Sequence, residues 1–166
     1  MAYSAKYVVP YRRKREGRTN YRKRLELLKS RAIRLVIRKT NTSIIVQLAK
    51  YEPNGDRILY SITSKALSEY GWNHSYKCIP AAYLTGILIS KKIKELKIDS
   101  IVPDFGLHVS TKGNRLYAVL KGLIDAGVEI NVDEEMLPTE DRIYGEHIDD
   151  SIKKDVEKIK SQILNK

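Results

Sequence analysis

IRLVIRKTNTSIIVQLAKYEPNGDRILYSIT, residues 33–63, holds three runs in which apolar side chains recur at every second position. A period of two predicts β-strands that bury one face. The runs are Ile33–Lys39, Ile44–Leu48 and Arg57–Thr63, the third with Ile58, Tyr60 and Ile62 on one side. Turn residues separate the runs, most clearly at Pro53-Asn54-Gly55-Asp56. Short turns of this kind predict an antiparallel meander.

The first run has a second property, because cations occupy its alternate positions. Arg34 and Arg38 alternate with Ile33, Leu35 and Ile37. We therefore expect a strand with one buried face and one cationic face, the latter supporting the flanking helix in its contact with RNA.

Helical patterns begin on either side of the three strands. Asn20 can cap a helix that runs to about Ser30, with Leu25 and Leu28 facing inward. Ser64 can cap a short helix that ends near Gly71. Pro80 suits the first turn of a long helix to about Leu96.

The last third of the chain continues this alternation. Ile98–Pro103 is a candidate strand, and Asn114 or Ser110 opens a helix that ends before Gly127. Asp150 or Ser151 can cap a final helix with apolar residues at helical spacing. Strands followed by helices and a further strand predict an α/β fold, with a mixed sheet between helices in three layers, α/β/α.

We expect three regions along the 166 residues. Residues 1–19 lack apolar periodicity and form a basic arm that orders on its partner, while residues 20–130 form the α/β core. Residues 131–166 form an acidic loop and the C-terminal helix. The part 131–150 has eight acids and one base, Arg142, so we expect it to cover the core or meet a basic protein and to avoid RNA.

Charge is concentrated at the N-terminus. Residues 1–39 hold fourteen Lys or Arg and two acids, a net +12, within a chain whose net charge is +11. Crowded like charges repel, and a polyanion is the partner that neutralises them. Tyrosines between the cations offer ring faces for base stacking. This combination indicates a nucleic-acid-binding protein.

The candidate RNA-binding residues come from the arm, the helix after it, the first strand and one later loop. They are Lys6, Tyr7, Tyr11, Arg12, Arg13, Lys14, Arg15, Arg18, Asn20, Tyr21, Arg22, Lys23, Arg24, Arg34, Arg38, Lys112 and Asn114. Lys112 and Asn114 precede a helix, where they could cradle a phosphate or simply cap the helix. Trp72 could stack on a base or lie in the core, and we favour the core.

Composition argues against several other classes of protein. The single cysteine, Cys78, excludes a Cys-based zinc site and an intrachain disulfide, and it is best read as a small core residue. No apolar run approaches the roughly 20 residues that span a bilayer, so we expect no membrane partner and a cytoplasmic location. We expect no cofactor, no metal site and no catalytic residues.

The alternative is a metal-dependent nuclease. Carboxylates such as those of Asp99, Asp104 and Asp133–Glu135 could in principle hold two metal ions. Runs of acids are usually solvated loops, however, and His74, His108 and His147 lack metal-ligand spacing. Cleavage of RNA that requires a divalent metal would favour this alternative over stoichiometric binding.

Several motifs resemble those of a known family. PYRRKREGRTNY at residues 10–21, PNGD at 53–56, EYGW at 69–72, IPAAYLTG at 79–86 and DAG at 125–127 are similar to the archaeal and eukaryotic branch of ribosomal protein L-eighteen. The resemblance runs in register from about residue 3 to residue 148.

This resemblance implies a fold and a function. The fold would be a core of ribonuclease-H-like topology that acts as a non-catalytic scaffold. The function would be a structural one in the large ribosomal subunit, with the basic arm on 5S rRNA. In the central protuberance the protein would also touch the large-subunit rRNA and neighbouring ribosomal proteins.

Overall fold

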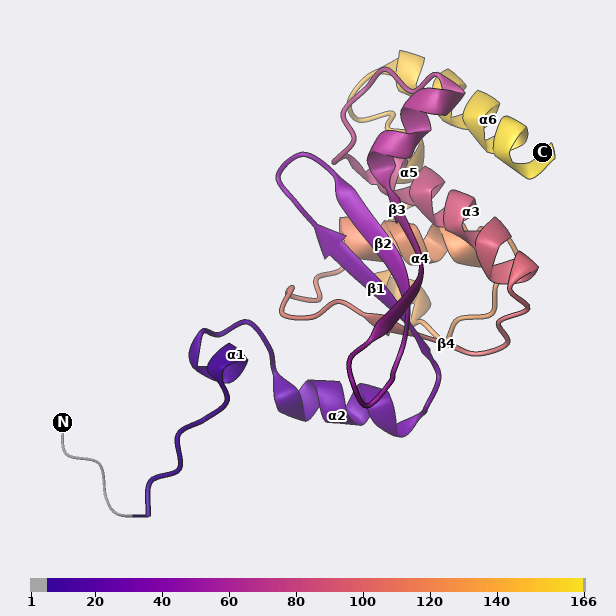
Figure 1. Ribbon diagram of the computed structural model, residues 1–166. Helices are drawn as coiled ribbons and strands as arrows, with labels where there is room; N and C mark the ends of the chain where they lie inside the picture. The colour runs from indigo at the N-terminus through magenta and orange to yellow at the C-terminus, as the bar shows by residue number, and fades with distance from the viewer. Residues whose placement is uncertain (1–5, 166) are drawn as a thin grey trace.

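Four strands in the order β3-β2-β1-β4 form one mixed sheet at the centre of the molecule (Figure 1). Strands β1 (Ile33–Lys39), β2 (Ile44–Lys50) and β3 (Arg57–Thr63) pair antiparallel, and β4 (Ile101–Asp104) lies parallel to β1. This computed structural model describes residues 6–165, so the first five residues of the predicted arm lie outside it. The predicted α/β fold with a mixed sheet is confirmed, whereas its ribonuclease-H-like topology stays a prediction.

One face of the sheet is apolar, as the period of two predicts. Leu35 and Ile37 of β1 and Val46 and Leu48 of β2 are completely buried. The prediction for β3 is wrong at Ile58, which is 52% exposed. The register shifts between Leu48 and Ala49, where Leu48 faces Tyr60 and Ala49 faces Ile58. This bulge places Ile58 among the residues of the opposite, polar face.

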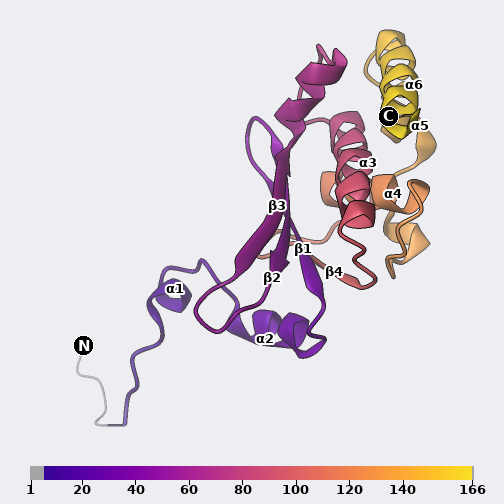
Figure 2. The same cartoon turned by 45° about the vertical axis from the view of Figure 1, so that its right-hand side comes forward.

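Helices α3 (Ile79–Glu95) and α4 (Arg115–Asp125) cover the apolar face (Figure 2). They cross at two glycines, and an added Cβ on Gly86 would lie 2.2 Å from the carbonyl oxygen of Val119. Glycine therefore permits the close backbone approach of the two helices. Helix α3 packs against the sheet and α4 on one side and against a second apolar cluster on the other. It is therefore buried along most of its length.

A second apolar cluster lies on the side of α3 away from the sheet. It joins α3 to the 3₁₀ helix η1 (Ser64–Tyr70), to α5 (Glu140–Tyr144) and to α6 (Asp150–Asn165). The predicted stripe of α6, which is Ile152, Val156, Ile159 and Ile163, is buried there. Trp72 belongs to the same cluster, which confirms its assignment to the core.

The acidic region contributes to the core as well. Val132, Met136 and Leu137 pack against the sheet-side cluster, around the short 3₁₀ helix η2 (Glu134–Met136), and Ile143 is buried in the outer one. The prediction that this region covers the core is confirmed. The carboxylates of its described side chains lie on the surface, while its apolar residues pack against the core.

The N-terminal segment extends away from the helices that cover the sheet (Figures 1 and 2). It contains one helical turn, α1 (Arg12–Arg15), and helix α2 (Tyr21–Lys29). Within residues 6–19, α1 buries no side chain, and the expectation that the arm orders on its partner stays a prediction. Asn20 caps α2 as predicted, but Leu25 is 60% exposed and does not face inward.

Candidate nucleic-acid interface

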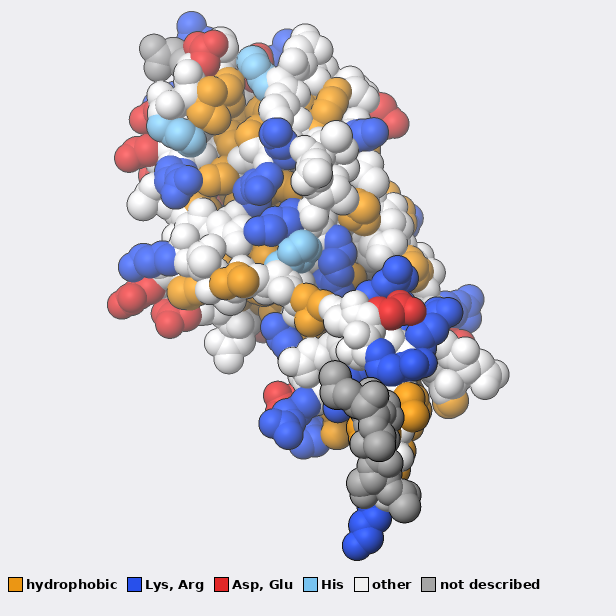
Figure 3. Space-filling model, turned by 90° about the vertical axis from the view of Figure 1, so that its left-hand side faces the viewer, with side chains coloured by type: hydrophobic (Ala, Val, Ile, Leu, Met, Phe, Trp, Pro, Cys, Tyr) orange, Lys and Arg blue, Asp and Glu red, His pale blue; other side chains and the backbone are white. Residues whose placement is uncertain are grey.

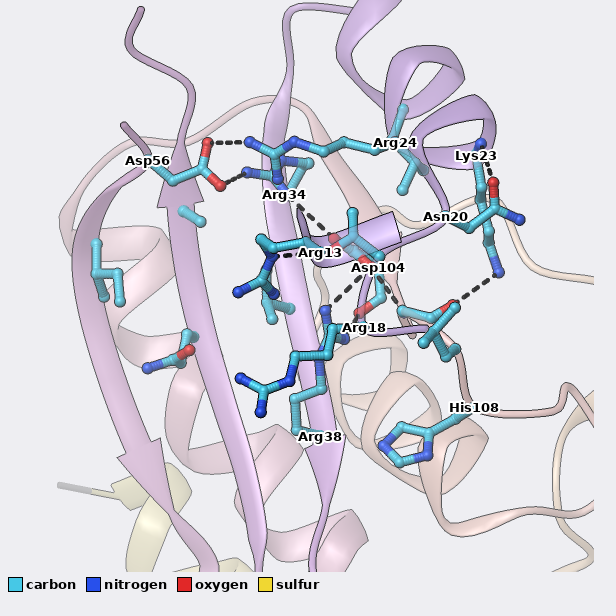
Figure 4. A pocket seen from close by; sticks show the side chains of 18 residues that line it. Arg13, Arg18, Asn20, Lys23, Arg24, Arg34, Arg38, Asp56, Asp104 and His108 are labelled. Atoms are coloured by element: carbon cyan, nitrogen blue, oxygen red, sulfur yellow. Dashed lines mark hydrogen bonds and ion pairs between the residues drawn. The ribbon is translucent and has the colours of Figure 1, made fainter. Parts of the chain in front are cut away.

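A cavity of about 490 Å³ lies between the N-terminal segment and the polar face of the sheet. We call it the arm cavity. Figure 4 shows that its walls come from α2, from β1 and β2, and from the loop after β4. The cations Arg13, Arg18, Lys23, Arg24, Arg34 and Arg38 line it, together with the carboxylates Asp56 and Asp104. Apolar side chains such as Leu27 and Ile58 complete the wall.

Local hydrogen bonds hold the segment that forms the cavity's outer wall. Asn20 Oδ1 accepts from the backbone N–H of Lys23 at 3.1 Å and so begins α2. Arg13 Nε donates to Thr19 Oγ1 at 2.8 Å, which ties α1 to the residues before α2. Lys23 Nζ reaches the carbonyl oxygen of Gly106 at 3.5 Å, across to the loop after β4.

The floor of the cavity is an ion-pair network centred on Arg34. Its Nη2 atom lies 2.6 Å from Asp56 Oδ2, and its Nη1 atom lies 3.0 Å from Asp104 Oδ2. Arg24 Nη2 from α2 reaches the other oxygen of Asp56 at 2.8 Å. Arg38 Nη1 donates to the backbone oxygen of Asp104 at 2.6 Å. The network joins α2, β1, β4 and the turn before β3.

This network bears on the cationic face of β1, from which Arg34 was predicted to contact RNA. Arg34 is only 2% exposed, and both of its terminal nitrogens lie beside carboxylates. It acts inside the protein and presents no free charge to RNA. Arg38 is partly exposed and keeps one side toward the cavity. The sequence alone does not show that Arg34 is neutralised, because Asp56 and Asp104 come close to Arg34 only in the folded chain.

Two side chains that line the cavity, Asp56 and His108, have shifted pKa values. Burial raises the pKa of Asp56, but the hydrogen bonds from Arg34 and Arg24 outweigh burial and leave the pKa below its ordinary value. Burial and the charges of Lys39 and Arg38 lower the pKa of His108. His108 was not among the predicted site residues, since an isolated histidine in a loop carries no pattern. Gln47 of β2 also lines the cavity and was missed, since a single glutamine in a strand carries no pattern either.

Outside the cavity, most of the predicted arm residues are exposed. Tyr11 and Tyr21 lie with their ring centroids 5.5 Å apart, and Tyr11 is 75% exposed. Arg12 and Arg18 share the carboxylate of Glu16 at 3.6 and 3.1 Å. The other predicted residues on this exposed surface are Lys6, Tyr7, Lys14, Arg15 and Arg22. Only two acids, Glu16 and Glu26, accompany so many bases, which leaves the surface strongly positive.

The structure does not bring Lys112 and Asn114 to the arm cavity. Asn114 caps α4, since its Oδ1 accepts from the backbone N–H of Leu116 and its Nδ2 donates to Thr111 Oγ1. The capping role that the sequence left open is therefore present. Lys112 is exposed and lies 3.7 Å from Glu135.

The described carboxylates are not grouped as a two-metal nuclease would require. Asp104 binds Arg34 and Arg38, and within residues 6–165 no three His, Cys, Asp or Glu side chains lie close enough to hold a metal ion. Cys78 is partly buried, its Sγ donates to the carbonyl oxygen of Ser75 at 2.9 Å, and burial raises the pKa of its thiol. No helix in the described part of the chain has the length and apolar character needed to cross a bilayer.

Comparison with known proteins agrees with the motifs in the sequence. The family described as "Ribosomal large subunit proteins 60S L5, and 50S L18" matches residues 5–104. The chain is 50% identical to large ribosomal subunit protein uL18 of Korarchaeum cryptofilum, over 89% of the chain and 76% of the relative. It is 48% identical to the uL18 protein of Methanothrix thermoacetophila, over 90% of the chain and 89% of the relative. A matched region of this extent and identity means that the chain belongs to this family of large-subunit ribosomal proteins.

Proposed function

We propose that this protein is a structural, non-catalytic component of the large ribosomal subunit, in the cytoplasm, and that its N-terminal segment binds 5S rRNA. The observation that carries the proposal is the exposed surface of α1 and α2, where arginines and lysines far outnumber acids and stand beside Tyr11 and Tyr21. Family membership supports the ribosomal role. The choice of 5S rRNA, and of the central protuberance as its location, rests on the resemblance of the arm motif.

The proposed mechanism is mainly electrostatic. Arg12, Lys14, Arg15 and Arg22 would neutralise phosphates where RNA strands converge, because guanidinium forks match phosphate oxygens in pairs. Tyr11 is exposed enough for an unpaired base to stack on its ring. Specificity would come from the folded shape of the RNA, since the deep major groove of A-form RNA hides the base edges.

The ion-pair network would give this surface its fixed position. Arg24 and Asp56 tie α2 to the sheet, so the cations of α1 and α2 are presented from a rigid base. Pre-positioned cations lose less conformational entropy on binding than cations on a free chain. The large-subunit rRNA and neighbouring ribosomal proteins would contact the rest of the molecule.

The test is a titration of the full-length protein with a 5S rRNA transcript over a range of salt concentrations. If about six phosphates are neutralised, log Kd should change with log salt with a slope of roughly 4 to 5. A transfer RNA of similar size is the competitor that measures specificity. Equal affinity for both RNAs, or an affinity that does not depend on salt, would contradict the proposal.

A further inference from the structure

A second group of basic side chains lies away from the arm cavity, around a shallow pocket of about 540 Å³. We call it the α4 patch. It is formed by Lys39, Lys77, Lys112, Arg115, Arg142 and His147. These residues come from the end of β1, the loop before α3, the start of α4, and α5 with the turn after it. Four separate segments of the chain thus bring basic side chains to one place.

The cations of this patch are poorly neutralised. Among the side chains that the structure describes, Lys39, Lys77 and Arg142 form no ion pair, and Lys112 lies 3.7 Å from the exposed carboxylate of Glu135. Arg115 is held differently, because its Nη1 donates to the carbonyl oxygen of Lys77 at 3.0 Å. That bond fixes the guanidinium at the rim of the pocket and leaves its other N–H groups for a ligand.

The position of Arg142 is the most informative feature. It is the single base among eight acids in residues 131–150. Within the described side chains it pairs with none of them, and its Nη1 lies instead beside Gly113, in the loop before α4. The fold therefore leaves the one base of an acidic segment unpaired with the described acids of that segment and adds it to a cluster of like charge. Such an arrangement costs repulsion unless an anion occupies the pocket.

The patch and the arm cavity form one positive surface. Lys39 borders the patch and also contributes, after burial and with Arg38, to the lowered pKa of His108 in the arm cavity. In Figure 3, lysine and arginine side chains follow one another from the N-terminal segment up across this face of the molecule. An extended polyanion can follow such a surface, whereas a small anion would occupy one part of it.

We propose that the α4 patch binds the phosphate backbone of a second RNA segment, distinct from the one held by α1 and α2. Lys77, Arg115 and Arg142 contact its phosphates, and the hydroxyls of Ser75 and Thr111 at the same pocket supply further hydrogen bonds. The protein then clamps two RNA segments across one face. The inference that the polyanion is RNA rests on the proposed function. The α4 patch itself is a different surface from the one formed by α1 and α2.

The first experiment removes charge from the patch in the full-length protein. Lys77→Gln with Arg142→Gln removes two cations that make no ion pair among the described side chains. Lys154→Gln with Lys158→Gln on the exposed side of α6 is the matched control. Affinity is measured for a 5S rRNA transcript and, separately, for deproteinised large-subunit rRNA, so that the two possible sources of the second segment are distinguished.

For one of the two RNAs, we expect the patch variant to bind about 5-fold to 20-fold more weakly and to lower the salt slope by about one to two units. The control should change affinity less than about 2-fold. If neither RNA distinguishes the patch variant from the control, the proposal is wrong. If substitutions in the arm weaken 5S rRNA binding, the proposed function stands even when the patch variant behaves like the control. Failure of the patch proposal can therefore be told apart from failure of the proposed function.

The second experiment locates the RNA directly. Thr111→Cys in a Cys78→Ala background carries a tethered iron chelate at the patch, and Arg15→Cys in the same background carries it on α1. In the assembled large subunit, hydroxyl radicals from the two positions should cut different rRNA segments. Cleavage of the same segment from both positions would overturn the proposal. So would cutting of a neighbouring protein, with none of rRNA, from Thr111, because the patch would then serve an acidic protein.

Discussion

Arg34 Nη1 lies 3.0 Å from Asp104 Oδ2, so a buried ion pair joins the parallel strands β1 and β4. The same guanidinium reaches Asp56 at 2.6 Å, and through that carboxylate it is linked to Arg24 of α2. The sheet and the N-terminal segment therefore share one network of charges. A change in the network should affect both the stability of the fold and the position of α2.

Asp104→Asn should lower the free energy of unfolding by about 3 kcal/mol, because it leaves the buried charge of Arg34 with one carboxylate in place of two. Urea denaturation followed by circular dichroism measures the change. The control is Glu52→Gln, which removes an exposed partner 4.0 Å from Arg57 and should cost less than about 1 kcal/mol. Equal effects of the two substitutions would show that the network does not stabilise the fold.

The stability of the protein should fall in acid partly through Asp56. Its pKa is lower in the folded chain than its ordinary value of 3.8, so the folded state favours the carboxylate. The resulting stabilisation is fully present above that ordinary value and is lost as the pH falls through the lowered pKa. Asp56→Asn should therefore show a smaller loss of stability than the unaltered protein as the pH falls below that ordinary value. Parallel curves for the two proteins would contradict this assignment.

Gly86→Ala should destabilise the crossing of α3 and α4. The added methyl carbon would lie 2.2 Å from the carbonyl oxygen of Val119, and backbone atoms cannot yield as a flexible side chain can. We expect a loss of about 3 kcal/mol or more. Gly122→Ala meets the carbonyl oxygen of Tyr83 at the same distance and should behave alike. Thermal melting of both variants measures the effect, and an unchanged melting temperature would mean that the helices can separate at little cost.

Arg12→Ala with Arg13→Ala should weaken binding to 5S rRNA and lower the salt slope by about one to two units, since two phosphate contacts are lost. The fold should be retained, because neither side chain is buried. Filter binding at several salt concentrations gives the slope, and circular dichroism confirms the fold. A variant with the slope of the unaltered protein would exclude these two arginines from the interface.

Most of the secondary structure could be predicted from local patterns. The alternation in residues 33–63, the cap at Asn20, Pro80 at the start of α3 and the stripe of α6 each depend on neighbours within a few positions. Patterns of this kind predict the local backbone, because the spacing of apolar residues that must share one face differs between a helix and a strand. Ile58 escaped prediction, since a bulge depends on how two strands pair and not on either strand alone.

The candidate site divides in the same way. The sequence by itself determined that the N-terminal segment is strongly basic and carries tyrosines, because charge and residue type need no fold to be read. Only the tertiary structure decided which arginines remain available to RNA. Arg34 and Arg38 have the same residue type and the same place in the alternation, yet Arg34 is buried between two carboxylates and Arg38 stays partly open. The carboxylates that neutralise Arg34 are 22 and 70 positions farther along the chain, and electrostatic pairing depends on distance in space.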